Sequence, residues 1–322
     1  MANDQQRRWC LFTSAGDWHA IRVWLKGDAP RLWDLVIAYY GDADHAFAEL
    51  SKLSCYAFRT KGSKYQNLKE LVLSDPKFFD RYSYVWVCDD DIIMSADQIN
   101  EAFNITETLG FWVAQPATRA EGNNGHWITL FAGAQWDYRI VNFVENGLAI
   151  FRRDKLTEFL AVYDGSLTGW GIEWWYANLF NADEFGRFAI IDWVQVTNPR
   201  SETKGGREMD RLRPAALREA DWHEVKTKYG LIQYPHKVFA YCKLSPERER
   251  LRIFLAMRDF PSLEPAWLER FRCSGWPYAA GLVKLGLIIR ALFETVRASG
   301  GRDAIWYLKC GLTIKRQRRG VN

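Results

Sequence analysis

The sequence lacks a strong excess of charge of either sign. Its 43 lysines and arginines nearly balance 39 aspartates and glutamates, which leaves a formal net charge of +4 and excludes a histone-like or ribosomal polycation. Charged residues at 25% and apolar residues at 48% are ordinary globular values, and they exclude an intrinsically disordered chain. At about 150 residues per domain, the 322 residues predict two domains or one large domain.

The sequence also shows no closely spaced cysteine pair, no evident signal peptide and no long apolar run. The six cysteines are widely spaced without a CxxC pair, which excludes a thioredoxin-like motif and is typical of reduced thiols in the cytosol. The N-terminus has basic residues, but the short apolar stretch that follows them breaks off at Ser14, Gly16 and Asp17, so no signal peptide is evident. The longest run without a charged residue, 122–136, holds two asparagines and a histidine, so no transmembrane helix is expected.

Aromatic residues, in contrast, are abundant. The 16 tryptophans, 14 tyrosines and 19 phenylalanines make up 15% of the chain. Most of these rings are expected in the core, but such rings also form stacking platforms for sugars and bases.

Short apolar runs alternate with helical patterns through the first 200 residues. The expected strands are Trp9–Thr13, Leu32–Tyr40, Cys55–Arg59, Tyr84–Cys88, Phe111–Ala114, Leu148–Phe151 and Ala189–Val196. The expected helices are Lys64–Leu73, Arg153–Ala161 and Ile172–Phe180, and 198–214 is an expected loop. This alternation predicts an α/β fold with a mixed, mainly parallel sheet flanked by helices.

Three adjacent carboxylates, Asp89, Asp90 and Asp91, follow the continuous apolar run YVWVC, which is typical of a strand buried on both faces. Ligands of open parallel sheets bind beyond the carboxyl ends of the strands. Carboxylates this close repel one another unless a cation neutralises them, and their oxygens suit Mg²⁺ or Mn²⁺. The pattern predicts a metal and phosphate site, with a solvated acidic turn or a helix N-cap as the alternative.

Several segments between residues 7 and 200 carry a resemblance to a known family. They are KGSKYQNLKELV at 61–72, YSYVWVCDDDI at 82–92, AQPA at 114–117, GHWIT at 125–129, VENGLAIFRRD at 144–154, GWGIEWW at 169–175 and IIDW at 190–193. The ordered set resembles glycosyltransferases of the A-type (GT-A) fold, whose DxD motif binds the metal and diphosphate of a nucleotide sugar. More narrowly, it is similar to a glycosyltransferase-like family known as domain of unknown function 707. The resemblance implies a GT-A-like, Rossmann-type catalytic domain over residues 1–243.

The resemblance assigns the triplet to the donor. Asp89 approaches the donor ribose or base and ligates Mn²⁺ or Mg²⁺ together with Asp91, while Asp90 assists. The donor implied is a nucleotide sugar.

Two further segments are implied to bind the donor. Lys61 and Lys64 open the helix before the triplet, where ammonium groups and a helix N-terminus suit a diphosphate, although two solvated lysines are the alternative. The turn at Ser14 and Gly16 is implied to cradle the base.

Glu173 is the implied general base. Inverting enzymes of this fold carry an acidic residue at this place, where it deprotonates the acceptor hydroxyl. Trp170 and Trp174 flank it and suit stacking on a sugar ring or a rise in the pKa of Glu173 by desolvation. The alternative is a surface glutamate beside core tryptophans.

Glu145 is expected to face the acceptor or the metal, and His126 to line the pocket, with a structural role as the alternative for His126. Relatives place a histidine after the IIDW-like strand as a further metal or phosphate ligand, whereas this sequence departs from that pattern. The third metal ligand is left open among Asn198, Asp192, His223 and His236.

The positive charge is concentrated at the C-terminus. Residues 245–322 hold 15 Lys/Arg and seven Asp/Glu, a net charge of +8, so the remainder sums to −4. A basic helical extension is expected over 244–322. Its amphipathic stretch 281–297 and its basic cluster 315–319 suit an anionic membrane surface, and helices packed on the catalytic domain are the alternative.

The resemblance, taken with these patterns, implies a cytoplasmic, metal-dependent glycosyltransferase, with an inverting course expected and a retaining one left open. A peripheral position at the inner face of the cytoplasmic membrane is also left open. Such an enzyme transfers a sugar to a hydroxyl of a glycan or lipid-linked acceptor in cell-surface polysaccharide or glycoconjugate biosynthesis. A nucleotidyl or phosphoryl transferase is an alternative, although SAGDWH is a poor match to the Gly-rich loop expected of it. A non-catalytic carbohydrate- or nucleic-acid-binding protein leaves DDD and GWGIEW unexplained, and no nucleic-acid partner is expected.

Overall fold

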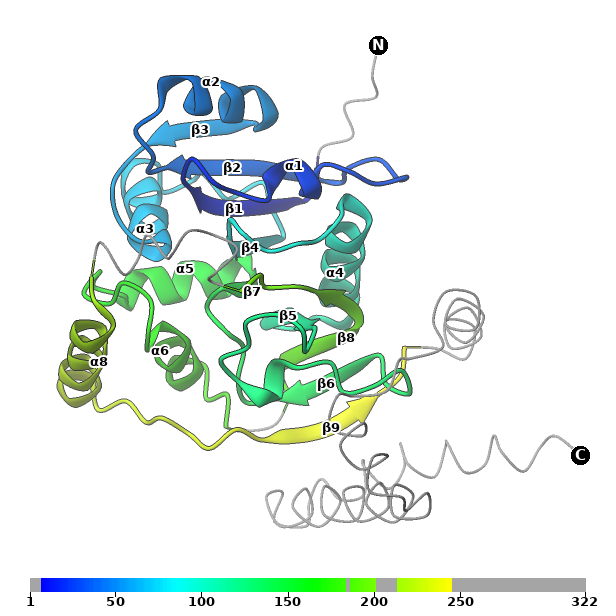
Figure 1. Cartoon of the computed structure of the whole chain (residues 1–322). Helices are drawn as coiled ribbons and strands as arrows, with labels where there is room; N and C mark the ends of the chain where they lie inside the picture. The colour runs from blue at the N-terminus through cyan, green and yellow to red at the C-terminus, as the bar shows by residue number, and fades with distance from the viewer. Residues whose placement is uncertain (1–6, 184–185, 201–212, 245–322) are drawn as a thin grey trace, which may run out of the picture.

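Nine strands form one mixed sheet in the described residues of this computed structural model, which are 7–183, 186–200 and 213–244 (Figure 1). The strands are β1 (Trp9–Ala15), β2 (Trp33–Tyr39), β3 (Tyr56–Arg59), β4 (Tyr84–Asp89), β5 (Val113–Thr118), β6 (Tyr138–Val141), β7 (Leu148–Arg152), β8 (Phe188–Val196) and β9 (Val238–Cys242). The helices are α1 (Ile21–Trp24), α2 (Asp44–Leu53), α3 (Lys64–Ser74), α4 (Ala96–Leu109), α5 (Arg153–Val162), α6 (Ile172–Leu179) and α8 (Ala215–Tyr229), with the 3₁₀ helix η1 (Trp127–Thr129). Residues 245–322, which carry the predicted basic extension, lie outside the described part.

The first half of the sheet has Rossmann-type connectivity. The strand order is β3-β2-β1-β4-β7-β5-β8-β6-β9, and β3, β2, β1 and β4 run parallel. Because β1 lies between β2 and β4, the chain changes direction across the sheet at β1 and β4. Ligands of open α/β sheets bind at such a switch point, beyond the carboxyl ends of the strands.

The second half of the sheet contains antiparallel pairs. β7 runs antiparallel to β4 and β5, β5 pairs in parallel with β8, and β6 runs antiparallel to β8 and β9. In the register of β4 and β7, Cys88 lies opposite Leu148. The loop that ends at Gly147 therefore meets the carboxyl end of β4, where the aspartate triplet lies.

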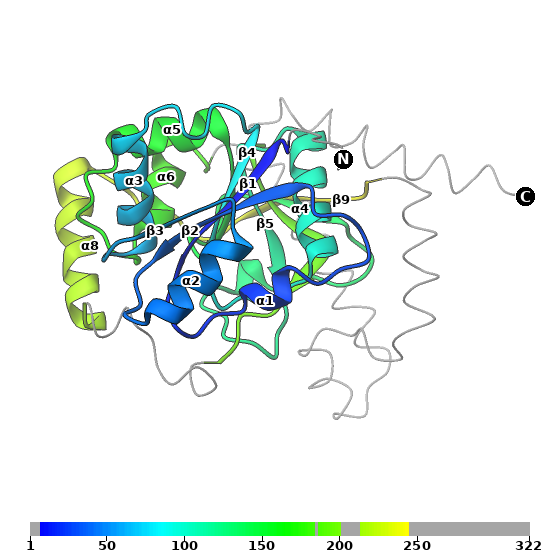
Figure 2. The same ribbon diagram turned by 90° about the horizontal axis from the view of Figure 1, so that it is seen from above.

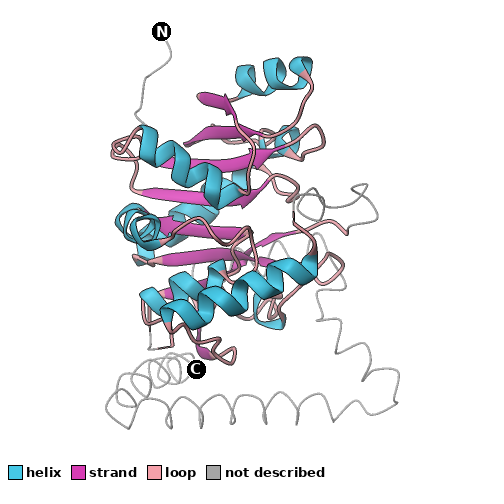
Figure 3. Ribbon diagram, turned by 90° about the vertical axis from the view of Figure 1, so that its left-hand side faces the viewer, coloured by secondary structure: helices cyan, strands magenta, loops and turns pink. Residues whose placement is uncertain are grey.

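Helices cover both faces of the sheet (Figures 2 and 3). Side chains alternate along β1: Cys10 and Phe12 pack in the cluster shared with α3, α5, α6 and α8, while Trp9 and Leu11 pack in the cluster shared with α1, α2 and α4. Because both faces are covered, the central strands have continuous apolar sequences instead of alternating ones.

The predicted mixed α/β fold is confirmed, and each strand and helix predicted within the described residues is present with slightly shifted ends. Helices α1, α2, α4 and α8 and strands β6 and β9 were not predicted. For α4 a signal exists, because Ser95 and Gln98 form a capping box at its start. β9 is an edge strand with mostly half-buried residues, so its apolar pattern is weak. Of the helices described, none is long and apolar enough to cross a membrane.

Candidate active site

The aspartate triplet lies at the carboxyl end of β4, at the switch point of the sheet. Asp89 is the last residue of the strand, and Ser14 of β1 lies beside it in register. The main-chain N–H of Gly16 donates to Asp90 Oδ2 at 3.1 Å, and the hydroxyl of Tyr40 lies 3.4 Å from the same oxygen. The turn after β1 and the triplet, which are predicted to serve one donor, are thus in contact.

The two lysines predicted to face the donor differ in their surroundings. Lys64 is the first residue of α3, its side chain is 9% exposed, and its Nζ donates to Asp89 Oδ1 at 2.6 Å. Lys61 has a side chain that is 62% exposed, and its Nζ donates to the carbonyl of Tyr40 and to Asp42 Oδ1, the latter at 2.8 Å. Lys64 is therefore part of the triplet's immediate surroundings, whereas Lys61 is largely solvated.

The charges at the triplet fit a hard divalent cation. Burial, together with the negative charge of Asp91, raises the pKa of Asp90, although the hydrogen bond from Gly16 opposes this rise. In the described residues no group of three or more His, Cys, Asp or Glu side chains converges as a complete metal site. Mg²⁺ commonly takes one or two carboxylates and completes its shell with substrate phosphates and water. The carboxylates present therefore fit a metal that binds together with the donor.

Glu173 is buried in the first turn of α6, with 4% of its surface exposed. Its Oε2 accepts a hydrogen bond from Asn146 Nδ2 at 2.5 Å, and its Oε1 accepts one from the main-chain N–H of Gly171 at 3.4 Å. Burial raises the pKa of Glu173, and the hydrogen bond from Asn146 opposes that rise. Glu173 is therefore not a solvated surface glutamate.

Gly171 shapes the turn that presents Glu173. Its φ of +94° lies in the region that favours glycine, and a Cβ on it would lie 2.3 Å from Cε3 of Trp222 in α8. Helix α8 therefore packs directly against this turn, and a larger residue cannot replace Gly171 without displacing Trp222.

Asn146 joins the two parts of the site, and the sequence pattern did not single it out. Its carbonyl accepts hydrogen bonds from Lys64 Nζ at 3.0 Å and from the hydroxyl of Tyr65 at 3.1 Å. Contacts thus run from Asp89 through Lys64 and Asn146 to Glu173. The signal that the sequence offers is the position of Asn146 within VENG, one of the segments that carry the resemblance.

His126 and Trp174 belong to an aromatic cluster with Phe143 and His236. The ring of His126 lies 4.4 Å from Phe143 and 5.0 Å from His236, and Trp174 stacks on His236 at 5.6 Å. Burial, aided by the charge of His236, lowers the pKa of His126 to about 4. Trp174 is only 2% exposed, so its ring is already covered. Trp127, which is 60% exposed and 6.1 Å from His236, offers a free face at this cluster.

Glu145 and Trp170 flank this region from two loops. The main-chain N–H of Glu145 donates to Gln115 Oε1 at 2.6 Å, and its carboxylate lies next to Gly125, from which a Cβ would be 3.8 Å away. Trp170 precedes Gly171 and is 43% exposed. Its exposure makes Trp170, unlike Trp174, a ring that a substrate reaches without rearrangement.

The four candidates for a third metal ligand have different surroundings. Asp192 is fully buried, and its two oxygens accept hydrogen bonds from Arg139 at 2.8 and 3.0 Å, so they are already used. His223 is exposed on α8, and His236 lies in the aromatic cluster.

Asn198 is the candidate that backbone pairing brings next to the triplet. Its neighbour Thr197 forms an antiparallel bridge with Ile93, two residues beyond Asp91. The two main-chain hydrogen bonds of this bridge measure 2.8 and 3.2 Å.

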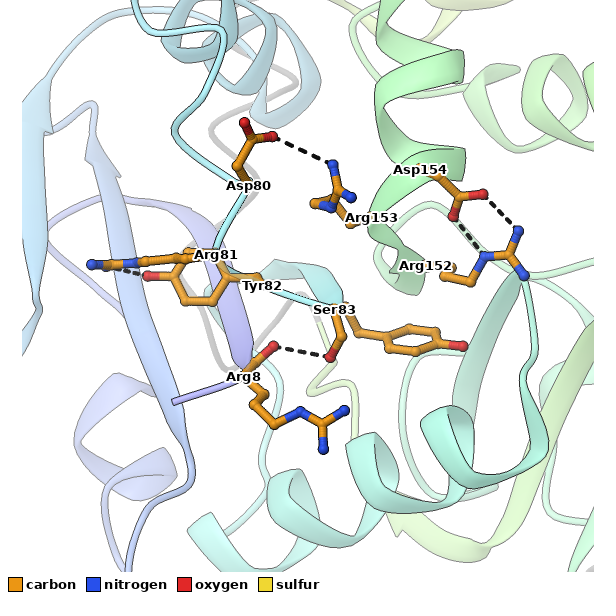
Figure 4. A pocket seen from close by; sticks show the side chains of 9 residues that line it. Arg8, Asp80, Arg81, Tyr82, Ser83, Arg152, Arg153 and Asp154 are labelled. Atoms are coloured by element: carbon orange, nitrogen blue, oxygen red, sulfur yellow. Dashed lines mark hydrogen bonds and ion pairs between the residues drawn. The ribbon is translucent and has the colours of Figure 1, made fainter. Parts of the chain in front are cut away.

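A cavity of about 460 Å³ lies at the amino ends of β1 and β4, at the opposite end of these strands from the triplet; Figure 4 shows its lining side chains. It is lined by Arg8, Asp80, Arg81, Tyr82, Ser83, Tyr84, Arg152, Arg153 and Asp154. These residues precede or begin β1 and β4, or join β7 to α5. Arg152 donates two hydrogen bonds of 2.6 Å to Asp154, and Arg153 lies 3.4 Å from Asp80. The cavity contains none of the predicted site residues.

Comparison with solved structures places this fold among glycosyltransferases. No protein-family model matches the chain, and no curated protein matches it in sequence. The structure of S. aureus TarS 1–349 in complex with UDP-GlcNAc is similar at 11% identity and a TM-score of 0.51, over 90% of this chain and 81% of that one. A structure of GalNAc-T7 with UDP, GalNAc and Mn²⁺ is also 11% identical, with a TM-score of 0.42, over 61% of this chain and 44% of that one.

The chain thus has a GT-A-like glycosyltransferase fold, as expected. At 11% identity the likeness to TarS concerns the fold alone. The narrower resemblance to domain of unknown function 707 stays a prediction, since no family model matches.

Proposed function

We propose that the protein is a metal-dependent glycosyltransferase that moves a sugar from a nucleotide sugar to a hydroxyl of a glycan or lipid-linked acceptor. The observation that carries this proposal is the series of contacts from Asp89 through Lys64 and Asn146 to Glu173. It connects an acidic strand end at the switch point with a buried carboxylate. A fold similar to TarS in complex with UDP-GlcNAc supports the choice of donor.

Asp89 and Asp91 would hold Mn²⁺ or Mg²⁺, with Asp90 beside them and Asn198 as the candidate third ligand. Bound there, the cation supplies positive charge that offsets the negative charge developing on the leaving diphosphate. Lys64 adds a positive charge at the same edge, because its Nζ lies 2.6 Å from Asp89 Oδ1. Ser14, Gly16 and Lys61 line the turn and loop beside the triplet, and in this proposal they contact the nucleotide.

Glu173 is the proposed general base. The acceptor hydroxyl loses its proton to the Glu173 carboxylate as its oxygen attacks the anomeric carbon, and the bond to the nucleoside diphosphate breaks. Attack from the face opposite the leaving group inverts the anomeric centre. Burial raises the pKa of Glu173 and makes it a stronger base, while the amide of Asn146 favours the ionised form that the reaction needs.

Glu145, His126, Trp170 and Trp174 are the proposed acceptor side of the site. The exposed ring of Trp170 is suited to stack on a sugar, and the buried Trp174 supports the cluster that holds His126. We further propose that the basic C-terminal region, residues 244–322, brings the enzyme to the anionic inner face of the cytoplasmic membrane, where lipid-linked acceptors of cell-surface polysaccharides are reached.

Calorimetry with a panel of nucleoside diphosphates and nucleotide sugars, with and without Mn²⁺, tests the proposal. Binding is expected to require the cation and to weaken in Asp89→Ala and Asp91→Ala. Asp80→Ala, at the amino end of β4, is the matched control and is expected to bind the nucleotides as the wild type does. Unchanged affinity in both triplet variants would contradict the proposed metal role of these aspartates. Reaction products that show cleavage between the two phosphates, instead of between the sugar and the diphosphate, would indicate a nucleotidyl transferase.

A further inference from the structure

The side-chain amide of Asn146 is fixed in one orientation. Its Nδ2 donates to Glu173 Oε2 at 2.5 Å and to the carbonyl of Gly169 at 3.2 Å. Both partners accept hydrogen bonds, and only the nitrogen of the amide can donate them, so the flipped orientation is excluded.

The main chain of the same loop holds the other part of the site. The carbonyl of Asn146 accepts from Lys64 Nζ at 3.0 Å, and Lys64 is paired with Asp89. The next carbonyl, that of Gly147, accepts from the main-chain N–H of Asp89 at 2.9 Å. Gly147 also lies against the Asp89 side chain, because a Cβ on it would be 2.5 Å from Asp89 Oδ2. One loop therefore contacts both Asp89, the carboxylate proposed to bind the sugar donor, and Glu173, the proposed base.

We infer that Asn146 is a positioning residue, which holds the Glu173 carboxylate ionised and in one orientation and connects it through Lys64 with Asp89. This inference rests on the proposed function, because it assigns to Glu173 the role of base. The inference adds Asn146 to the proposed site: its side chain contacts the base Glu173, and its carbonyl contacts Lys64, the lysine proposed to bind the donor.

The physical basis is the balance of groups around a buried carboxylate. The charged and titratable groups that face Glu173 are Lys64, which favours its ionised form, and the hydroxyls of Tyr65 and Tyr176. Burial raises the pKa of both tyrosines; the charges of Asp89 and then of Glu173 add to the rise for Tyr65, and Tyr65 and then Glu173 add to it for Tyr176. Burial itself favours the neutral form. The amide of Asn146 donates directly to the carboxylate, so its removal leaves weaker support for the ionised form.

Asn146→Ala and Asn146→Asp in the full chain test the inference. Aspartate keeps the size of the side chain but replaces the donor with a second carboxylate, so it raises the Glu173 pKa more than alanine does. Glu173 is followed by carbon-13 NMR of protein labelled at the glutamate carboxyls, with its signal assigned by Glu173→Gln. Turnover of the nucleotide sugar is measured across pH, and donor affinity by calorimetry.

The expected result is an upward shift of the Glu173 titration and of the acidic limb of the rate profile. Turnover at neutral pH is expected to fall about 10²-fold, as for a misplaced catalytic group, with donor affinity within about threefold of wild type. Asn100→Ala is the matched control, because Asn100 is also buried but bonds only main-chain atoms of Pro30 and Leu32. It is expected to lower thermal stability without moving the titration.

An unmoved Glu173 titration in both Asn146 variants would overturn the inference, whatever the activity. If Asn146→Ala does not fold, Asn146→Asp carries the same test. The titration needs no substrate, so it is separate from the proposed function: a wild-type protein that turns over no nucleotide sugar contradicts that function, while a shifted titration still supports the role of Asn146.

Discussion

The two ends of β4 differ in how their charges are balanced. At the carboxyl end three aspartates, Asp89 to Asp91, follow one another, and Lys64 pairs with the first of them. At the amino end the arginines around the cavity each have a carboxylate partner. The pairs are Arg8–Glu107, Arg81–Asp34, Arg152–Asp154 and Arg153–Asp80. At about 3.3 Å per residue, the length of β4 separates the two ends by about 17 Å.

Charge balance and the described cavity point to opposite ends of β4. A surplus of like charge costs folding free energy, and such a local cost is expected at functional sites. The 460 Å³ cavity lies at the amino end of β4, where each arginine is already paired. The surplus of negative charge lies at the carboxyl end, at the switch point where ligands of such sheets bind.

The largest expected effect comes from Glu173→Gln. Glutamine keeps the shape of the side chain but cannot accept the acceptor's proton, so transfer is expected to fall by about 10²–10⁴-fold while donor binding is retained. Glu107→Gln, the same change at the opposite end of the strands, is expected to leave transfer unchanged. Product formation from a radiolabelled nucleotide sugar measures both, and a fully active Glu173→Gln would end the role of Glu173 as base.

Two glycines with positive φ, one at each end of the parallel strands, allow the stability of the two ends to be compared. Gly171→Ala forces a Cβ against Trp222 as well as a strained backbone, so it is expected to cost about 2–5 kcal/mol of unfolding free energy. Gly110 has a φ of +66°, and a Cβ on it would meet nothing within 4 Å, so Gly110→Ala is expected to cost about 1–2 kcal/mol. Chemical denaturation gives both values, and equal losses would mean that α8 does not hold the turn before Glu173.

The position of the triplet could be predicted from sequence, because a buried strand and a run of carboxylates both leave local patterns. YVWVC followed by DDD indicates a strand end with surplus charge, and the structure has β4 there. GWGIEWW likewise begins a helix, with Glu173 in its first turn.

The contacts between these segments could not be predicted, because they depend on how distant segments meet. Lys64 and Asn146 are 82 residues apart in the chain, and they touch because α3 packs against β1 and β7 pairs with β4. Lys61 and Lys64 look alike in sequence, yet one is 62% and the other 9% exposed. Trp170 and Trp174 differ in the same way, because α6 turns Trp174 into the core.

The same substitution at the two ends of β4 is expected to have opposite signs. The raised pKa of Asp90 means that the metal-free protein loses stability as pH rises above the unfolded-state pKa, so Asp90→Asn is expected to stabilise it at neutral pH by about 0.5–2 kcal/mol. The gain shrinks as pH falls. Asp154, whose pKa is lowered by the hydrogen bonds from Arg152, contributes stability that is lost in acid, so Asp154→Asn is expected to destabilise at neutral pH. Thermal unfolding across pH in a chelator measures both, and destabilisation by both variants would contradict the surplus of charge at the triplet.

The smallest effect is expected at the cavity itself. Arg152→Gln removes an ion pair whose side chains are 35% and 51% exposed, so it is expected to cost at most about 1 kcal/mol and less at high salt. The cost is expected to vanish as pH falls, because the pKa of Asp154 is lowered by Arg152 and the pair is lost once Asp154 is protonated. Donor affinity and transfer are expected to stay at wild-type values. A loss of donor affinity in Arg152→Gln would place a substrate at the arginine-lined edge and remove the contrast between the two ends of β4.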